Sequence, residues 1–144
     1  MHKVKEIYGV PLTSSPAAVD TITAHFKDRE IDENYYDIVA TGDLGKLGHS
    51  IAKEQLVQSG IDLKDKYIDC GMEIFNLETQ DVHAGGSGCG CCAAVFAGYI
   101  YNLLKSGRVN KVLLVATGAL MSTTSTFQGE SIPGIAHAVA IERV

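Results

Sequence analysis

The segment that most restricts the fold is a long apolar run, residues 88–105, which reads GCGCCAAVFAGYIYNLLK. Its composition and length predict one helix that is apolar on nearly every face as far as Asn102. A helix that covers one side of a sheet normally shows a polar stripe towards solvent. We therefore expect this helix to be covered on both sides. Since a chain of 144 residues supplies one sheet, the second cover has to come from outside this unit.

Helical and strand patterns alternate along the rest of the chain. Residues 112–116 are continuously apolar, like strands that are buried on both faces in parallel sheets. The order βαβαβαββ predicts a single three-layer α/β domain, residues 1–144, with a mostly parallel five-stranded sheet. Residues 72–83 are ambiguous, with a strand-like pattern at 73–75. The expected strands are residues 3–8, 38–40, 67–70, 112–116 and 135–141. The expected helices are residues 16–27, a helix that begins near 44 and ends at Gly60, and residues 88–105. Ser15 is the expected N-cap of the first helix.

Charge and composition exclude several classes of function. A total of 17 Asp and Glu against 12 Lys and Arg gives a net charge of −5, which argues against nucleic acid as a partner. No stretch reaches the roughly 20 continuous apolar residues of a membrane span, and the N-terminus lacks the apolar region of a signal peptide. The 4 cysteines do not form a disulfide framework, because three of them crowd at positions 89, 91 and 92. We expect a soluble, intracellular protein in a reducing compartment.

A glycine-rich turn, Gly85-Gly86-Ser87-Gly88, precedes the long apolar helix. Backbone N–H groups at such a position favour anions and developing oxyanions, and glycine lets a ligand approach the backbone closely. The alternative is tight helix–sheet packing, for which small residues suffice. The turn is not a P-loop, since no Gly-Lys-Ser/Thr follows. Cys89 could be a thiolate near a helix start, but buried small side chains are the favoured interpretation of the cysteines, and their spacing disfavours zinc.

Two further positions are candidates for a site. Asp43 follows the strand at 38–40, at the carboxyl end where open α/β sheets bind ligands, although it could equally cap the next helix. The loop 118–133 contains Ser122, Thr123 and Thr124 and is long enough to suggest a function. Neither His49 nor His83 has an obvious partner at a fixed spacing. Spacing alone does not identify a chemistry for these residues.

Four stretches, residues 14–22, 36–56, 84–93 and 112–142, together resemble the C-terminal part of the stage V sporulation protein AD family, a branch of the thiolase-like fold. The resemblance implies that this unit is equivalent to the C-terminal half of that fold. Two such halves would stack as a five-layered αβαβα sandwich, with one central helix from each half. That arrangement would cover the helix at 88–105 on both sides.

The resemblance also implies a role in spores. Proteins of this family are needed for dipicolinic acid to enter the developing spore and for its release in germination, and they are expected to bind it directly. The implied partners are the N-terminal thiolase-like half or another copy of the chain, and membrane proteins of the same operon. The implied location is the developing spore, peripheral at its inner membrane. The ligand would be dipicolinic acid, alone or as its calcium chelate.

Catalysis is not expected. Condensing enzymes of this fold use a nucleophilic cysteine from the N-terminal half and a His or Asn after the strand that corresponds to 37–41. Here Thr41, Gly42 and Asp43 stand after that strand, and Gly85–Ser87 stand at the position of a second His or Asn. Without these groups a thioester carbonyl is not polarised. The alternative function is a thiolase-like acyltransferase half that another chain completes.

These inferences combine into one predicted site, without catalytic residues, cofactor or bound metal ion. A ligand is expected between the three candidate segments, with backbone N–H groups facing a carboxylate. The predicted ligand-binding residues are Asp43, Gly85, Gly86, Ser87, Gly88, Cys89, Ser122, Thr123 and Thr124.

Helical phase predicts which side chains of residues 88–105 face the sheet. The side that faces away from the sheet would be bare in an isolated chain, so we expect a homo-oligomer. The residues expected against the sheet are Ala93, Phe96, Ala97, Ile100 and Leu104, and those expected on the opposite side are Cys92, Val95, Tyr99 and Leu103.

Overall fold

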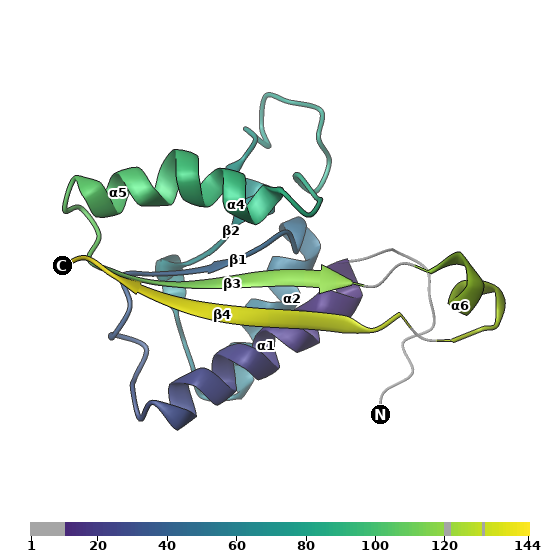
Figure 1. The fold of residues 1–144 in the computed structure, drawn as a ribbon, viewed down its shortest axis with the longest axis horizontal. Helices are drawn as coiled ribbons and strands as arrows, with labels where there is room; N and C mark the ends of the chain where they lie inside the picture. Colours follow the sequence, from purple (N-terminus) through teal and green to yellow (C-terminus); the bar gives the residue numbers. More distant parts are fainter. Residues whose placement is uncertain (1–10, 120–121, 131) are drawn as a thin grey trace.

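Four strands form an open mixed sheet in the part of the chain that the computed structural model describes, residues 11–119, 122–130 and 132–144. The sheet order is β2-β1-β3-β4 (Figure 1). The central strand β1 is parallel to both of its neighbours, and β4 is antiparallel to β3. The strands are β1 (Ile38–Thr41), β2 (Tyr67–Asp69), β3 (Lys111–Ala119) and β4 (Gly134–Glu142).

Helices cover both faces of this sheet, which gives three layers (Figure 1). The helices α1 (Pro11–Asp28) and α2 (Gly45–Gln58) pack on one face over a core that includes Ile22, Val39 and Leu113. The opposite face carries the apolar helix formed by α4 (Cys91–Val95), the π-helical turn η2 (Phe96–Ile100) and α5 (Tyr101–Lys105). Shorter helices are η1 (Lys64–Lys66), α3 (Cys70–Glu73) and α6 (Thr123–Phe127).

The α/β class and the strands near 38–40, 67–70, 112–116 and 135–141 are confirmed. The described sheet has four strands and is mixed: both pairs made by β1 are parallel, as expected, and β4 runs antiparallel to β3. The fifth strand expected at 3–8 lies outside the described residues. Equivalence to half of a thiolase-like fold stays a prediction.

Two local predictions are wrong. The first helix begins at Pro11 and includes Pro16, so Ser15 is not its N-cap. Ser15 is instead buried, and its hydroxyl donates to the carbonyl of Gly48 on α2 at 3.1 Å. The strand-like pattern at residues 73–75 does not form a strand, because Ile74 and Phe75 pack against Gly86 of the glycine-rich turn.

The long apolar helix begins at Cys91 rather than at residue 88, and its middle turn is π-helical. A π-helical turn holds more residues than an α-helical turn, so it shifts the phase of everything after it. Val95 and Ile100, five positions apart, are both buried, and Leu103 and Leu104 follow on the same side.

The predicted faces assumed a uniform α-helix and are wrong in part. Ala93 and Val95, which precede the π-helical turn, lie on the opposite sides from those expected, and the turn then brings Ile100 and Leu104 onto the expected side. Val95 and Leu103 face the sheet rather than away from it, whereas Ala93 and Ala97 are exposed. The prediction is confirmed for Ile100 and Leu104, which are buried, and for Tyr99, which is 46% exposed. Phe96 is partly buried against the same core, as expected, and so is Cys92, for which the prediction of the opposite side is wrong.

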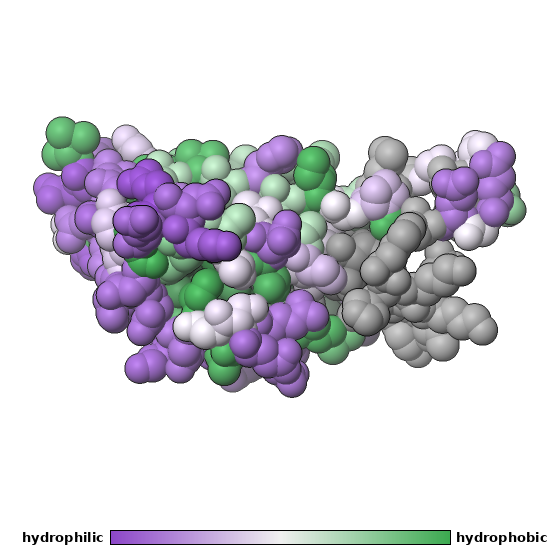
Figure 2. All heavy atoms as spheres, turned by 90° about the horizontal axis from the view of Figure 1, so that it is seen from below, coloured by the Kyte–Doolittle hydropathy of each residue, from purple (hydrophilic) through white to green (hydrophobic). Residues whose placement is uncertain are grey.

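Within residues 11–119, 122–130 and 132–144, no element covers the outer side of the apolar helix. Ala93, Ala97 and Gly98 are exposed there. On β4, Ala136 and Ala138 pack towards α1, so the alternate residues Ile135 and Val139, which are 55% and 56% exposed, point to the side of the apolar helix. Hydrophilic residues surround the apolar ones on the α1 side, which Figure 2 shows. The apolar surface on the other side agrees with the expected need for a second cover.

A buried carboxylate, that of Asp69 at the end of β2, joins the segments at the carboxyl end of the sheet. It accepts a hydrogen bond from the Thr41 hydroxyl at 2.7 Å and from the backbone N–H groups of Leu44 and Gly45, both at 2.9 Å. The backbone N–H of Gly71 donates to it at 3.0 Å. Burial raises the pKa of Asp69, and the donors oppose that shift. One side chain therefore fixes the start of α2 and of α3 relative to β1.

We predict that Asp69→Asn lowers the free energy of unfolding by about 2–4 kcal/mol, because an amide leaves buried N–H donors unpaired and adds donors of its own. Urea denaturation measures this change. The exposed Asp65 is the matched control, and Asp65→Asn is expected to change stability by less than about 0.5 kcal/mol. Equal effects of the two substitutions would contradict this role of Asp69.

Candidate functional site

Asp43 lies at the centre of the candidate site. It directly follows Thr41 and Gly42 at the carboxyl end of β1, where its carboxylate accepts from the Thr117 hydroxyl of β3 at 2.9 Å. The other carboxylate oxygen accepts from the Ser87 hydroxyl at 3.1 Å and from the backbone N–H of Gly88 at 3.0 Å. The backbone N–H of Asp43 in turn donates to the Thr117 hydroxyl at 3.2 Å. Asp43 thus joins the ends of two strands to the glycine-rich turn.

Backbone contacts hold the glycine-rich turn against α2 and α3. The N–H of Gly86 donates to the carbonyl of Gly71 at 2.6 Å, and the N–H of Lys46 donates to the carbonyl of Ala84 at 2.7 Å. Gly85 has a φ of 116°, and a Cβ on Gly85 or Gly71 would collide with backbone oxygen atoms across this contact. Glycine is therefore required here for close approach of two backbones, as well as for the turn itself.

The structure brings together some of the predicted site residues and not others. Ser87 and Gly88 both donate hydrogen bonds to Asp43, and Gly85 and Gly86 lie next to them, half-buried. Cys89 follows the turn and is exposed.

The predicted contribution of Ser122, Thr123 and Thr124 does not fit this arrangement. Thr123 and Thr124 begin α6, which lies on an arm that extends beyond the end of the sheet, away from the glycine-rich turn (Figure 1). The arm results from the long pairing of β3 with β4, which continues to Ala119 and Gly134.

Thr117 and Asp69 are the residues that sequence reasoning missed. Both stand at or near the carboxyl end of a buried strand, the same position that identified Asp43. Applying that rule to every predicted strand would have found them. The sequence holds no comparable signal for Gly71, whose role depends on which backbone lies against it.

The site contains acidic side chains, and the buried thiol of Cys91 beside it is protonated. Burial, with the charges of Asp43 and Asp69, raises the pKa of Cys91 to about 11. Cys91 is therefore a neutral thiol at neutral pH and a poor nucleophile. Across the ranges that the structure describes, no group of three or more His, Cys, Asp or Glu side chains is arranged to hold a metal ion.

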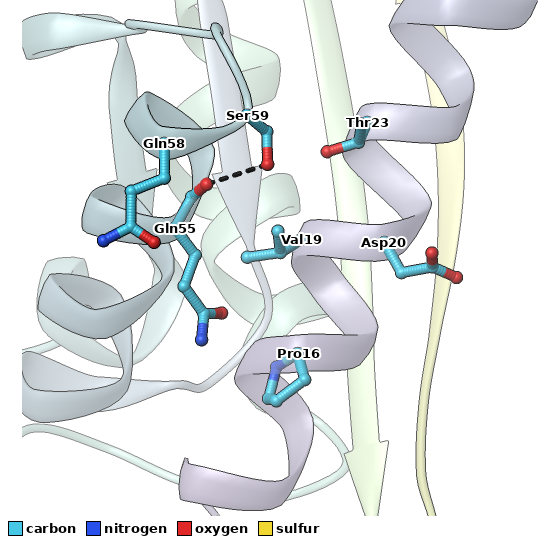
Figure 3. Close-up of a pocket in the computed structure, with 7 residues that line it drawn as sticks. All are labelled: Pro16, Val19, Asp20, Thr23, Gln55, Gln58 and Ser59. Atoms are coloured by element: carbon cyan, nitrogen blue, oxygen red, sulfur yellow. Dashed lines mark hydrogen bonds between the residues drawn. The ribbon is translucent and has the colours of Figure 1, made fainter. Parts of the chain in front are cut away.

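A separate groove of about 410 Å³ lies between α1 and the C-terminal end of α2 (Figure 3). That end of α2 is roughly 15–20 Å from Asp43, given a rise of about 1.5 Å per residue. In Figure 3, Thr23 and Val19 point towards α2, whereas Asp20 points away from it. The groove offers no cationic side chain to a carboxylate ligand. Its lining residues are Pro16, Val19, Asp20, Thr23, Gln55, Gln58 and Ser59.

We predict that Gly71→Ala destabilises the chain by about 1–3 kcal/mol, because its Cβ would push the carbonyl of Gly86 out of contact. Gly90→Ala is the matched control, since Gly90 has a φ of −93° and open space around its Cα. Urea denaturation of both variants, with limited proteolysis of residues 76–88, measures the effect. Equal stability and equal proteolysis of the two variants would show that the close backbone contact is unimportant.

Comparison with known proteins identifies the family. The family model described as Stage V sporulation protein AD (SpoVAD) matches residues 5–142. The chain is 46% identical over 129 residues to "Stage V sporulation protein AD" of Bacillus subtilis (strain 168), an alignment that covers 90% of this chain and 38% of that protein. No helix in the described ranges is both long and apolar enough to span a bilayer. The chain thus belongs to the stage V sporulation protein AD family.

Proposed function

We propose that this sporulation protein supplies one wall of a binding site for dipicolinic acid, an aromatic dicarboxylate, without catalysing a reaction. The observation that carries the proposal is the carboxylate of Asp43, held by Thr117, Ser87 and Gly88 where β1, β3 and the glycine-rich turn meet. These hydroxyl and N–H donors already bind one carboxylate. A ligand carboxylate of the same chemistry fits the same donors.

Competition with Asp43 would then govern binding. The donors that suit the ligand are occupied by an acidic side chain, and Asp43 would repel a dianion at close range. The ligand either displaces Asp43 from Ser87 and Gly88 or binds with a cation between the two carboxylates. Calcium dipicolinate would use the second mode, in which the calcium is part of the cargo.

The environment of His83 supports a non-catalytic role. His83 lies close to the glycine-rich turn in sequence, but its side chain is 89% exposed and pairs with Asp81 at 3.3 Å. Asp43 has hydroxyl and N–H partners and no histidine partner among the described residues. The alternative, a thiolase-like acyltransferase half completed by another chain, predicts acyl-CoA turnover that disappears in Cys89→Ala.

We further propose that the uncovered side of the apolar helix packs against the rest of a longer family protein, or against a second copy in the isolated chain. The chain spans 38% of the length of the Bacillus subtilis relative, so the larger part of such a protein is available to cover it. Light scattering that shows a clean monomer at high concentration would contradict self-association. Contact with membrane proteins of the same operon, at the inner membrane of the spore, is a proposal that rests on the family alone.

We predict that a full-length family protein binds dipicolinate measurably, whereas this chain alone binds no more tightly than about 1 mM, equivalent to about −4 kcal/mol. The weak binding follows because half of a cleft offers few hydrogen-bond donors to the ligand. Isothermal titration calorimetry of both proteins, with and without calcium, measures the difference. Absence of heat and of competition in the full-length protein would exclude a dipicolinate site here.

Asp43→Asn in the full-length protein separates the two modes of binding. Removing the charge is expected to leave binding of free dipicolinate unchanged or tighter. A large loss confined to the calcium-containing titration would instead support a cation bridge. Asp81→Asn is the matched control, because the Asp81 side chain is 92% exposed and does not touch the site.

A further inference from the structure

A hydrogen bond between two aromatic side chains joins the last turn of α1 to the connection that follows it. Nε2 of His25 lies 2.7 Å from the hydroxyl oxygen of Tyr36, two residues before β1 begins. The ring of Tyr36 packs against the rings of His25 and Phe26, with centroids 5.7 Å and 5.9 Å away. Tyr36 is fully buried, whereas His25 is only partly buried. A buried hydroxyl is thus tied to a histidine that solvent reaches.

The burial of Tyr36 fixes the direction of this hydrogen bond. Because the side chain is 0% exposed, its hydroxyl proton needs an acceptor inside the protein. Among the described residues, Nε2 of His25 is the one hydrogen-bond partner of this hydroxyl. The hydroxyl therefore donates and Nε2 accepts, which places the proton of the neutral imidazole on Nδ1.

The surroundings of His25 favour the neutral ring. Burial lowers the pKa of His25 below its ordinary value of 6.5, the charge of Arg29 lowers it further, and Asp28 opposes the shift. When the pH falls through 6.5, the unfolded chain therefore binds a proton at His25 that the folded chain resists. The stability that depends on the neutral ring is complete above this pH, and it is lost as the pH falls towards the pKa of the folded state.

The segment that Tyr36 anchors, residues 29–37, also contacts the end of the sheet at which β1 begins. The hydroxyl of Tyr35 donates to the Glu142 carboxylate of β4 at 2.7 Å. The Lys111 ammonium of β3 lies 3.8 Å from the centre of the Tyr35 ring. The rings of Tyr35 and Tyr36 meet edge to face, with centroids 4.9 Å apart. A change at Tyr36 therefore affects contacts with α1, β3 and β4.

We propose that His25 and Tyr36 form a proton-sensitive latch on residues 29–37. A proton that binds Nε2 uses its lone pair, so this nitrogen no longer accepts from Tyr36 and the buried hydroxyl loses its acceptor. Residues 29–37 then separate from the end of α1 more often. The latch precedes β1 and Asp43 follows β1, so the proposal does not depend on a ligand at the candidate site.

NMR of the nitrogen-15-labelled 144-residue chain tests the assignment without any variant. Correlations between the ring nitrogens and the ring protons give the tautomer of His25 and its titration. The expected result is an unprotonated Nε2 at about pH 7.5 and a titration midpoint below the ordinary value of 6.5. A proton on Nε2 at that pH, or a midpoint at or above 6.5, would overturn the proposal.

Amide hydrogen exchange measures the opening of the latch. Protection of residues 29–37, corrected for the intrinsic effect of pH on exchange, is expected to fall at least about threefold between about pH 7.5 and about pH 5.5. The connection after α2, residues 59–63, is the internal control and is expected to keep its protection. An equal fall in both segments, or no fall in residues 29–37, would contradict the latch.

Matched variants separate the hydrogen bond from the burial of the rings. His25→Gln offers an amide oxygen that accepts from Tyr36 and does not titrate, so the protection of residues 29–37 is expected to lose its pH dependence. Tyr36→Phe removes the hydroxyl alone, so protection is expected to be low at both pH values. His137→Gln is the control, because His137 is exposed on β4, and it is expected to respond like the unmodified chain. Circular dichroism confirms folding, and an unmodified response in a folded Tyr36→Phe chain would show that the hydrogen bond is not the latch.

Discussion

The carboxyl edge of the sheet depends on one buried acid, Asp69. A carboxylate that is 1% exposed is stable only if its oxygens are hydrogen-bonded, and here the donors come from the end of β1, the start of α2 and the start of α3. Because these donors lie on three segments, satisfying the acid also fixes the segments. The carbonyl of Gly71, placed in this way, then receives the N–H of Gly86. Asp69 thus determines where the glycine-rich turn lies.

The second acid, Asp43, lies among the segments that Asp69 holds in place. Its carboxylate binds donors from β3 and from the turn, so the site in the isolated chain is occupied by its own side chain. An anionic ligand has to compete with this arrangement or to bring a cation.

Much of the fold follows from local sequence signals. Short apolar segments such as 38–40 and 112–116 predict buried strands, and the position after a buried strand identified Asp43. The phase of the apolar helix was predicted only in part, because a helix that is apolar on nearly every face holds little information about which side faces the sheet. The π-helical turn at Phe96–Ile100 shifted that phase further. The distance of α6 from the site depends on how far β3 and β4 pair, which strand composition does not reveal.

The Asp43 carboxylate couples the end of β1 to β3 through the hydroxyl of Thr117. A double-mutant cycle of Asp43→Asn and Thr117→Val, measured by urea denaturation, tests it most directly. We expect a coupling energy of about 1 kcal/mol, whereas Asp43→Asn and Thr21→Val, a threonine that bonds Ala136 instead, are expected to be additive. Additivity of the two substitutions within about 0.3–0.5 kcal/mol would show that Asp43 does not couple the two strands through Thr117.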